Sequence, residues 1–373
     1  MKKFKFLSVA AALLAASVMV SCTSSDDPVV KPVITGMNTG EIVYKVTVKS
    51  NVETKFTFNG VTKTGTTAEF DVKASDYKAA LEAKAEPVDA AYSLGEKKAK
   101  VAFSTEKQTA LVEFNFVKPS TETKTQAEMI AGATVGNSAA NQKAAGVDVA
   151  IAVPEGTVIT GNTTDPFSIT AYKMPASLES TEIKKNETKT VDLFAFDCNP
   201  DGAKFDKDAV IKVNLGKEAA GLMISVNGVD YTVGNDGFVS IKASHFSNLI
   251  LAMKAAATDF SNGSQLIYEK NIDVVAGKNE FAYTKKTGIE TSATGVLLQY
   301  LTTLCGDLQT KDEEEKGSFE SSAAGKASLK VEQEYTDYTF KSGSVNFKAR
   351  VWAEVKATVT PSDGEAHSGG SAQ

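Results

Sequence analysis

The clearest pattern in the chain is a strict alternation of apolar and polar positions near its C-terminal end. Apolar side chains occupy every second position from Val345 to Val359, with mostly polar or charged residues between them. Because successive side chains of a strand point to opposite faces, this pattern predicts one long strand with a buried face. Residues 327–340 also alternate and precede the turn-forming residues 341–344, so we expect a long β-hairpin.

Shorter segments with the same period of two fill the chain before residue 260. Between residues 42 and 118 they are separated by turns such as Asn59-Gly60, which is typical of a small β-sandwich. A second series follows from Val147 onward and contains Asn227-Gly228, a strong hairpin signal because both residues can take positive φ. We therefore expect a second sandwich over residues 147–257.

One segment has a helical period instead. In residues 292–304 the apolar side chains recur at three- and four-residue spacing, and Gly306 stands just past the end. This predicts a helix in a C-terminal α+β domain, residues 258–360, in which residues 311–316 form a charged loop. The expected fold class is mainly β, with two or three antiparallel β-sandwich domains in tandem, the last with one helix and a long β-hairpin.

Composition suggests what separates these domains. Residues 119–146 are rich in Ser, Thr, Asn, Gln and Ala, and we interpret them as a linker. Residues 361–373 have the composition of a disordered tail. A hydrophobic content of 42% in 373 residues supports packed cores in between.

The beginning of the chain has the features of an export signal. Lys2, Lys3 and Lys5 precede an apolar run over residues 6–20, which is too short to span a bilayer stably. Residues 19–22, Met-Val-Ser-Cys, resemble the lipobox of bacterial lipoproteins, although Met19 stands where Leu is usual. The resemblance implies that residues 1–21 are removed as a lipoprotein signal peptide and that Cys22 is lipidated with palmitate-like acyl chains. Residues 22–41 would then form an acylated tether.

The polar, acidic residues that follow Cys22 resemble the surface-export tag of Bacteroidetes-type lipoproteins. This resemblance implies an outer-membrane, lipid-anchored protein that faces the cell exterior. Removing residues 1–21 takes away three lysines and no acid, so the net charge changes from −6 to −9. A negative protein of this kind argues against nucleic acid as a partner.

Three short motifs resemble a known domain by their residues and their order. They are residues 153–157 (Val-Pro-Glu-Gly-Thr), 200–207 (Pro-Asp-Gly-Ala-Lys-Phe-Asp-Lys) and 244–247 (Ser-His-Phe-Ser). This order is similar to the all-β domain shared by ankyrins, netrin receptors and zonula-occludens proteins, and it covers roughly residues 147–254. The resemblance implies a β-sandwich for this region.

Some members of that family cut themselves at the last motif. Carried over, this implies Ser247 as nucleophile, His245 as base and the Phe246–Ser247 bond as the one that breaks. The alternative is that Phe246 fills the core, Ser247 bonds to backbone and the chain stays intact. With only two histidines in the chain, we expect no other enzymatic activity and no cofactor.

Two further constellations each allow two interpretations. Asp197, Asn199, Asp201 and Asp208 have the spacing of oxygen ligands in a calcium loop, but the predicted flanking strands favour a simple turn at residues 200–202. If Cys22 is acylated, the two remaining cysteines, Cys198 and Cys305, either form a disulfide with each other or stay two separate buried thiols.

Together these observations predict a lipid-anchored surface protein that acts as a non-enzymatic binding, adhesion or structural scaffold for a protein or glycan ligand. It resembles the multidomain surface lipoproteins of gut Bacteroidetes. A first alternative is a pore-forming or toxin-like protein that inserts the 327–360 hairpin, since a transmembrane strand needs about 10 alternating residues. A second alternative is a surface protein that cleaves itself between Phe246 and Ser247.

Overall fold

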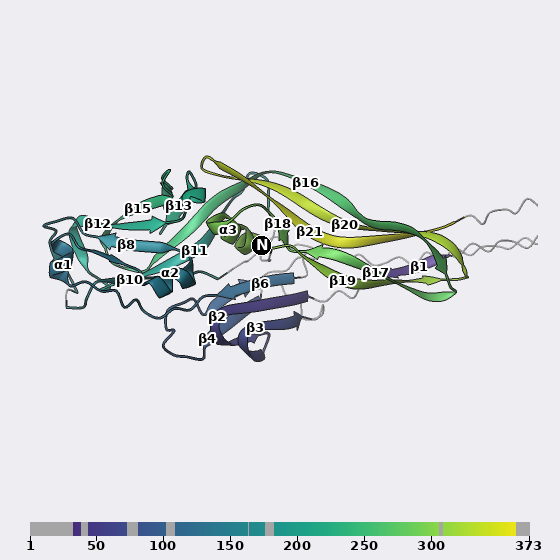
Figure 1. Ribbon diagram of the computed structural model, residues 1–373, viewed down its shortest axis with the longest axis horizontal. Helices are drawn as coiled ribbons and strands as arrows, with labels where there is room; N and C mark the ends of the chain where they lie inside the picture. Colours follow the sequence, from purple (N-terminus) through teal and green to yellow (C-terminus); the bar gives the residue numbers. More distant parts are fainter. Residues whose placement is uncertain are drawn as a thin grey trace, which may run out of the picture.

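The computed structural model describes residues 33–38, 44–72, 81–101, 109–162, 164–175, 183–305 and 309–362. Strands make up 65% of the described residues and helices 9%, so the predicted mainly β fold class is confirmed. The strands form several antiparallel sheets. The molecule is elongated, with rounded bodies toward one end and a long arm of strands toward the other (Figure 1).

The first body is a five-stranded sheet inside the predicted 42–118 sandwich. Its strands are β2 (Tyr44–Phe58), β3 (Val61–Val72), β4 (Leu81–Pro87), β5 (Lys98–Val101) and β6 (Thr109–Phe114). They lie in the order β3-β2-β4-β5, and β6 pairs in parallel with β2. Alternate side chains of β2, among them Val46, Val48, Phe56 and Phe58, are fully buried in a core of their own.

The second body contains two sheets and several short elements. They are α1 (Gln126–Ile130), β7 (Thr134–Gly136), α2 (Ala139–Ala145), β8 (Asp148–Ala152), β9 (Ile159–Thr160), β10 (Ser168–Lys173), β11 (Thr188–Asn199), β12 (Lys204–Asn214), the 3-10 helix η2 (Lys217–Ala219), β13 (Met223–Val226), β14 (Val229–Thr232) and β15 (Phe238–His245). One sheet has the order β15-β12-β8-β7, and β9 also pairs with β12. The predicted hairpin at Asn227-Gly228 is confirmed as the turn between β13 and β14.

The predicted linker over residues 119–146 is wrong, because this segment belongs to the second body. It supplies α1, α2 and β7, and β7 pairs with β8. Its polar side chains bond to the backbone: Asn141 Nδ2 donates to Lys118 O, at 2.9 Å, and Ser120 Oγ accepts from Ser138 N, at 3.2 Å. Polar composition here therefore reflects local hydrogen bonding and not a free connection.

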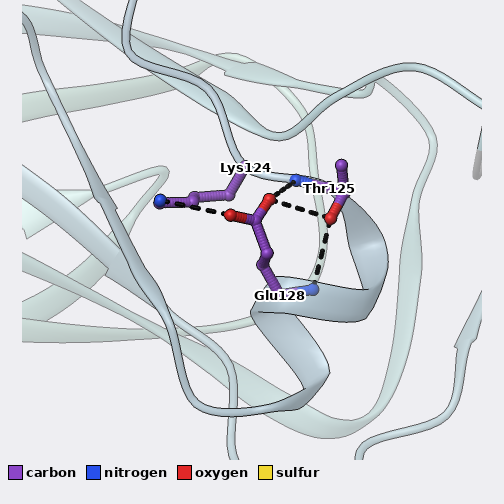
Figure 2. Close-up of polar contacts among 3 residues, drawn as sticks. All are labelled: Lys124, Thr125 and Glu128. Atoms are coloured by element: carbon purple, nitrogen blue, oxygen red, sulfur yellow. Dashed lines mark hydrogen bonds and ion pairs between the residues drawn. The ribbon is translucent and has the colours of Figure 1, made fainter.

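Helix α1 begins with a capping box (Figure 2). Thr125 Oγ1 accepts a hydrogen bond from Glu128 N, and Thr125 N donates to Glu128 Oε2 at 2.8 Å. Lys124 Nζ lies 3.3 Å from the other oxygen, Glu128 Oε1. These hydrogen bonds, with those from Thr125 as the largest cause, lower the pKa of Glu128. They satisfy donors that a helix start otherwise leaves open.

The rest of the chain forms the arm and its base. Its elements are β16 (Leu249–Val274), β17 (Gly277–Thr287), β18 (Ile289–Glu290), α3 (Gly295–Cys305), β19 (Lys311–Ser321), β20 (Gly325–Ser342), β21 (Val345–Pro361) and, from the start of the chain, β1 (Ile34–Asn38). The main sheet has the order β10-β11-β16-β20-β21-β18, and a three-stranded sheet β1-β19-β17 lies beside its arm (Figure 1). The long hairpin and the helix are confirmed.

The predicted boundary between residues 257 and 258 is wrong, because it falls inside a single strand. β16 pairs with β11 near Ala252 and with β20 as far as Val274, so one strand runs from the second body into the arm. The core of the second body also includes α3 and the hairpin residues Phe340 and Phe347. The arm has a separate core, which includes Phe281, Phe319, Leu329 and Val331.

Two smaller predictions are also wrong. The charged residues 311–316 form the start of β19 and not a loop, because charged side chains on the solvent side of the sheet pair with a neighbour, as Lys285 does with Glu315 at 3.1 Å. Residues 34–38, which we expected in the tether, form β1 and pair with β19. The rest of the expected tether, including Cys22, lies outside the described residues, as does the expected tail beyond residue 362.

Candidate functional site

The three motifs that carry the family resemblance meet at one end of the second body. Asp206 N donates to Val158 O, just after the first motif, and Asp206 Oδ1 accepts from Val158 N at 2.7 Å. Gly202 N donates to Phe246 O and Phe246 N donates to Ala203 O, which joins the second motif to the third. All of these contacts connect backbone segments, so the motifs have a structural role here.

The third motif has little of the geometry that self-cleavage needs. Phe246 is 1% exposed and packs in the core, while His245 is exposed and Ser247 is half-buried. Within the described chain, the hydrogen bond of the His245 ring is with Ser244 Oγ, at 3.4 Å, and none joins it to Ser247. The backbone of residues 246 and 247 does not have positive φ. Phe246 therefore fills the core, and the His245 ring is not hydrogen-bonded to Ser247 as a catalytic base would be.

The four residues of the calcium alternative lie on three parts of the fold, the end of β11, the following turn and β12. Asp197 and Asn199 end strand β11, and Asn199 Nδ2 donates to Asp197 Oδ2 at 2.8 Å, so the amide faces the carboxylate as a donor. Asp201 lies in the turn and Asp208 lies farther along strand β12. Among the described residues, no group of three or more His, Cys, Asp or Glu side chains could hold a metal ion.

Cys198 and Cys305 are not joined in a disulfide, so the alternative of a bridge is wrong. Both are buried, at 1% and 3% exposure, in the core that β11 and α3 share. Burial, with a smaller effect of Asp197, raises the pKa of the Cys198 thiol far above its usual range. A protonated, buried thiol is a poor nucleophile, so neither position offers thiol chemistry to solvent.

The long hairpin is held on both sides along its length. β20 pairs with β16 on one side and with β21 on the other, and Val331 and Leu329 are fully buried under the β17–β19 sheet. Gln333 strengthens this contact, because its amide donates to Lys286 O and accepts from Lys286 N, at 2.5 and 2.8 Å. Insertion of residues 327–360 would have to break all of these contacts.

A cleft of about 940 Å³ lies where the first body, the second body and α3 meet. Its size is within the range of small-molecule and short-peptide sites. The floor is apolar and includes Phe114, Phe194 and Leu215, which are at most 5% exposed. The rim is charged and amide-rich, with contributions from all three parts: Lys49 and Glu113, Gln142, Asp148, Lys173 and Glu218, and Gln299.

Two amide side chains fix the walls of this cleft. Asn115 Nδ2 donates to Ala144 O at 3.0 Å, and Asn115 Oδ1 accepts from Lys173 N at 3.0 Å, so the end of the first body is bonded to the second. On α3, Gln299 Nε2 donates to Leu193 O at 2.8 Å. The cleft is therefore a fixed feature of the fold.

The rim carries charged side chains of both signs. Among the described residues, none of Lys49, Glu113, Asp148, Lys173 and Glu218 makes an ion pair with another. Groups of both signs beside an apolar floor suit a ligand that is itself amphipathic, such as a peptide segment, and the amides suit hydroxyl-bearing ligands.

A second hollow of about 680 Å³ lies at the base of the arm. One wall carries the Arg350 guanidinium, which bonds to both carboxylate oxygens of Asp337, at 2.7 and 2.9 Å, and lies 3.7 Å from the centre of the Tyr335 ring. The other side includes Phe260, which is 42% exposed. The guanidinium, chiefly through these hydrogen bonds, lowers the pKa of Asp337.

Sequence reasoning missed the cleft entirely. Its residues come from eight separate stretches between Lys49 and Gln309, and none of them belongs to a recognisable motif. The one available signal was the concentration of Asn and Gln in residues 137–142, which we attributed to a linker.

Comparisons with known proteins leave this site without a precedent. No protein-family model matches the chain. Searches of curated proteins and of solved structures also found no significant match. Within the described residues, no helix has the length and apolar character to cross a bilayer. Cys22 and His367 lie outside the described residues.

Proposed function

We propose that this chain is a lipid-anchored protein of the bacterial outer membrane that presents a non-enzymatic binding scaffold to the cell exterior. The anchor is the lipidated Cys22, and the ligand is a protein segment or a glycan. The proposal places the chain among surface lipoproteins of the Bacteroidetes type. We also propose that the second body has the fold of the domain shared by ankyrins, netrin receptors and zonula-occludens proteins, which residues 147–254 resemble.

One observation carries the proposal: both described ends of the chain lie at the tip of the arm, away from the bodies. At the N-terminal end, Val33 N donates to Ser322 Oγ at 2.9 Å, in the loop before β20. At the C-terminal end, Ser362 N donates to Lys326 O at 2.9 Å. The tip therefore leads toward the anchor, while the second body lies at the opposite end of the molecule and the first body lies beside the base of the arm (Figure 1).

The distances are consistent with a scaffold that stands off a membrane. Ten residues separate Cys22 from Val33, and the eleven residue steps between them reach at most about 38 Å, at about 3.5 Å per residue. From Ala257 to Val274, β16 spans roughly 60 Å at about 3.3 Å per residue. The arm is therefore longer than the fully extended segment between Cys22 and Val33.

Localisation tests the anchor directly. The wild-type chain should sediment with outer-membrane fractions and be digested when intact cells are treated with protease. A Cys22→Ser variant should lose its membrane attachment, because the two or three acyl chains of the lipidated N-terminus supply the hydrophobic contact. Sedimentation of the variant with the envelope to the wild-type extent would overturn the proposal.

Cleft blocking tests the binding site. Thr303 of α3 is half-buried and lines the cleft, so Thr303→Trp should fill it. On arrays of immobilised glycans and peptides, a signal from the wild-type chain should be lost in this variant and kept in a Val229→Trp control, in which the exposed residue lies on the β13–β14 hairpin. Binding that survives in Thr303→Trp would place the site elsewhere.

Two measurements separate this function from the alternatives. Dye release from liposomes by the purified chain would favour a pore-former that uses residues 327–360. A mass corresponding to two fragments cut before Ser247 would favour self-cleavage. We expect no dye release and an intact chain.

A further inference from the structure

The tip of the arm combines two exposed valines with the ends of the chain. Val33 is 62% exposed and Val275, in the loop between β16 and β17, is 57% exposed. Ala276 and Ala324 are exposed in the same group of loops, because Val274 pairs with Gly325 and Gly277 pairs with Ser321. The group Val33, Val275, Ala276 and Ala324 is called the tip patch below.

Both valines are held outward by hydrogen bonds. Ser322 fixes Val33, since its hydroxyl accepts from Val33 N and its own N donates to Val33 O. Asn279 fixes the second loop: its Oδ1 accepts from Val275 N at 3.0 Å, and its Nδ2 donates to Val275 O and Gly277 O. The apolar side chains are thus presented by a rigid end and not by loose loops.

The charges beside the tip patch are of both signs, with one more acidic than basic side chain. Asp273 is opposite Lys326 in the β16–β20 pair, and Lys278 is opposite Glu320 in the β17–β19 pair. Lys278 Nζ also lies 2.8 Å from Glu280 Oε1. A surface of this kind has no net positive field with which to attract anionic lipid.

We propose that the tip patch is a membrane-contact surface that rests in the lipid interface next to the acylated Cys22. This proposal rests on the proposed function, because it assumes the lipid anchor. The occupant is argued from the chain itself: residues 1–32 contain the expected anchor, and they join the described structure at Val33, inside the patch. A bilayer is therefore within reach of these valines whenever the anchor is inserted.

The contact orients the protein and does not hold it there alone. The favourable free energy of burial grows with the apolar area removed from water. Two partly buried valines therefore contribute far less than the long acyl chains of the anchor. Together with the anchor, however, they favour the arm with its tip toward the lipid and its bodies outward.

A tryptophan reporter tests the contact. The chain from residue 22 onward, produced without residues 1–21 so that the Cys22 thiol stays free, is coupled through Cys22 to a maleimide lipid in phosphatidylcholine vesicles with brominated acyl chains, which quench indole in contact with them. Coupling is confined to Cys22 because Cys198 and Cys305 are buried. In Val275→Trp, the added emission should shift to the blue and be lost to quenching. In a Val229→Trp control, whose tryptophan lies on the second body, the added emission should be neither shifted nor quenched.

Second variants show whether the apolar patch is responsible. In the Val275→Trp background, Val33→Glu should reduce the quenching, while Val229→Glu should leave it unchanged. Adding phosphatidylglycerol or salt should change little, because the contact is apolar. Equal quenching of the two tryptophan reporters, or quenching indifferent to Val33→Glu, would overturn the proposal.

Chemical coupling keeps this result separate from the anchor itself. If Cys22 proves not to be acylated in cells, the proposed function fails while the vesicle experiment still reports on the tip. If localisation succeeds and Val275→Trp is not quenched, the membrane-contact proposal fails alone.

Discussion

Phe246 illustrates how much of the second body depends on single side chains. Its ring is 5.6 Å from that of Phe167 and 4.8 Å from that of Phe205, centroid to centroid, and both contacts are edge-on. Its backbone pairs with Gly202 and Ala203. One residue therefore joins three segments that are far apart in the sequence.

Truncation of this ring should be costly. Phe246→Ala removes a side chain that is 1% exposed and leaves a cavity among the rings, so we expect the free energy of unfolding to fall by about 3–5 kcal/mol. Urea unfolding followed by circular dichroism measures the loss. The neighbouring Ser247→Ala, half-buried, should change stability much less. Equal effects of the two substitutions would contradict the assigned core role.

The two buried cysteines should be protected from reagents in the folded chain. In a Cys22→Ser variant, iodoacetamide at pH 8 should modify neither Cys198 nor Cys305, because both are buried and the pKa of Cys198 is raised. In denaturant both should react, and mass spectrometry counts the adducts. Two results would contradict the structure. One is modification of either cysteine in the native chain, and the other is modification in denaturant that requires prior reduction of a disulfide.

At the scale of elements, the sequence predicted those helices and strands whose apolar and polar residues repeat regularly within one segment. The β20–β21 hairpin and α3 were predictable because their apolar faces repeat within one segment. β16 was not, because its 26 residues face a core only at their two ends and its middle, including the exposed Leu266, carries no alternation. The charged start of β19 likewise depends on β17, a partner that sequence does not reveal.

The hairpin should also have an acid-sensitive contact. Asp337 and Arg350 are directly opposite on β20 and β21, and the pKa of Asp337 is lowered in the folded chain, chiefly by hydrogen bonds from Arg350. Its contribution is thus present above the unfolded pKa, near 3.8, and is lost as pH falls through the lower folded value.

An Asp337→Asn variant tests this contact. It should be less stable than the wild-type chain at pH 7 by a fraction of a kcal/mol, since the pair is half-exposed and screened. The difference should shrink as pH falls below 3.8 and vanish only below the lower pKa of the folded chain, where the folded carboxyl also protonates. Thermal unfolding across this pH range measures it. A difference that grows toward acid would show that the sign is wrong.

For the whole molecule, the arrangement of the parts could not be predicted from the sequence. Predicted domains were divided at residues 118 and 257, but the first body is fastened to the second through Asn115, and β16 continues from the second body into the arm. Neither a single asparagine nor a strand that lacks alternating apolar and polar residues can be recognised from the sequence as a connection between domains. The cleft, which depends on this arrangement, was therefore also out of reach.

The junction between the two bodies should depend on Asn115. Asn115→Ala removes the bonds to Ala144 O and Lys173 N, so we expect the first body to move relative to the second. Small-angle X-ray scattering should show a broader distance distribution, and hydrogen exchange should rise at residues 144–146 and 173. Asn279→Ala, whose bonds stay within one loop, is the control. An unchanged scattering profile in Asn115→Ala would contradict this account.

The unbroken course of β16 also decides how the protein responds to mechanical load. Its neighbour β20 runs alongside it from Lys341 to Gly325, lengthwise in the molecule (Figure 1). Interstrand hydrogen bonds lie across the strands, so tension between tip and body loads the whole row in shear at once and does not peel it bond by bond. The arm should accordingly resist extension along its length.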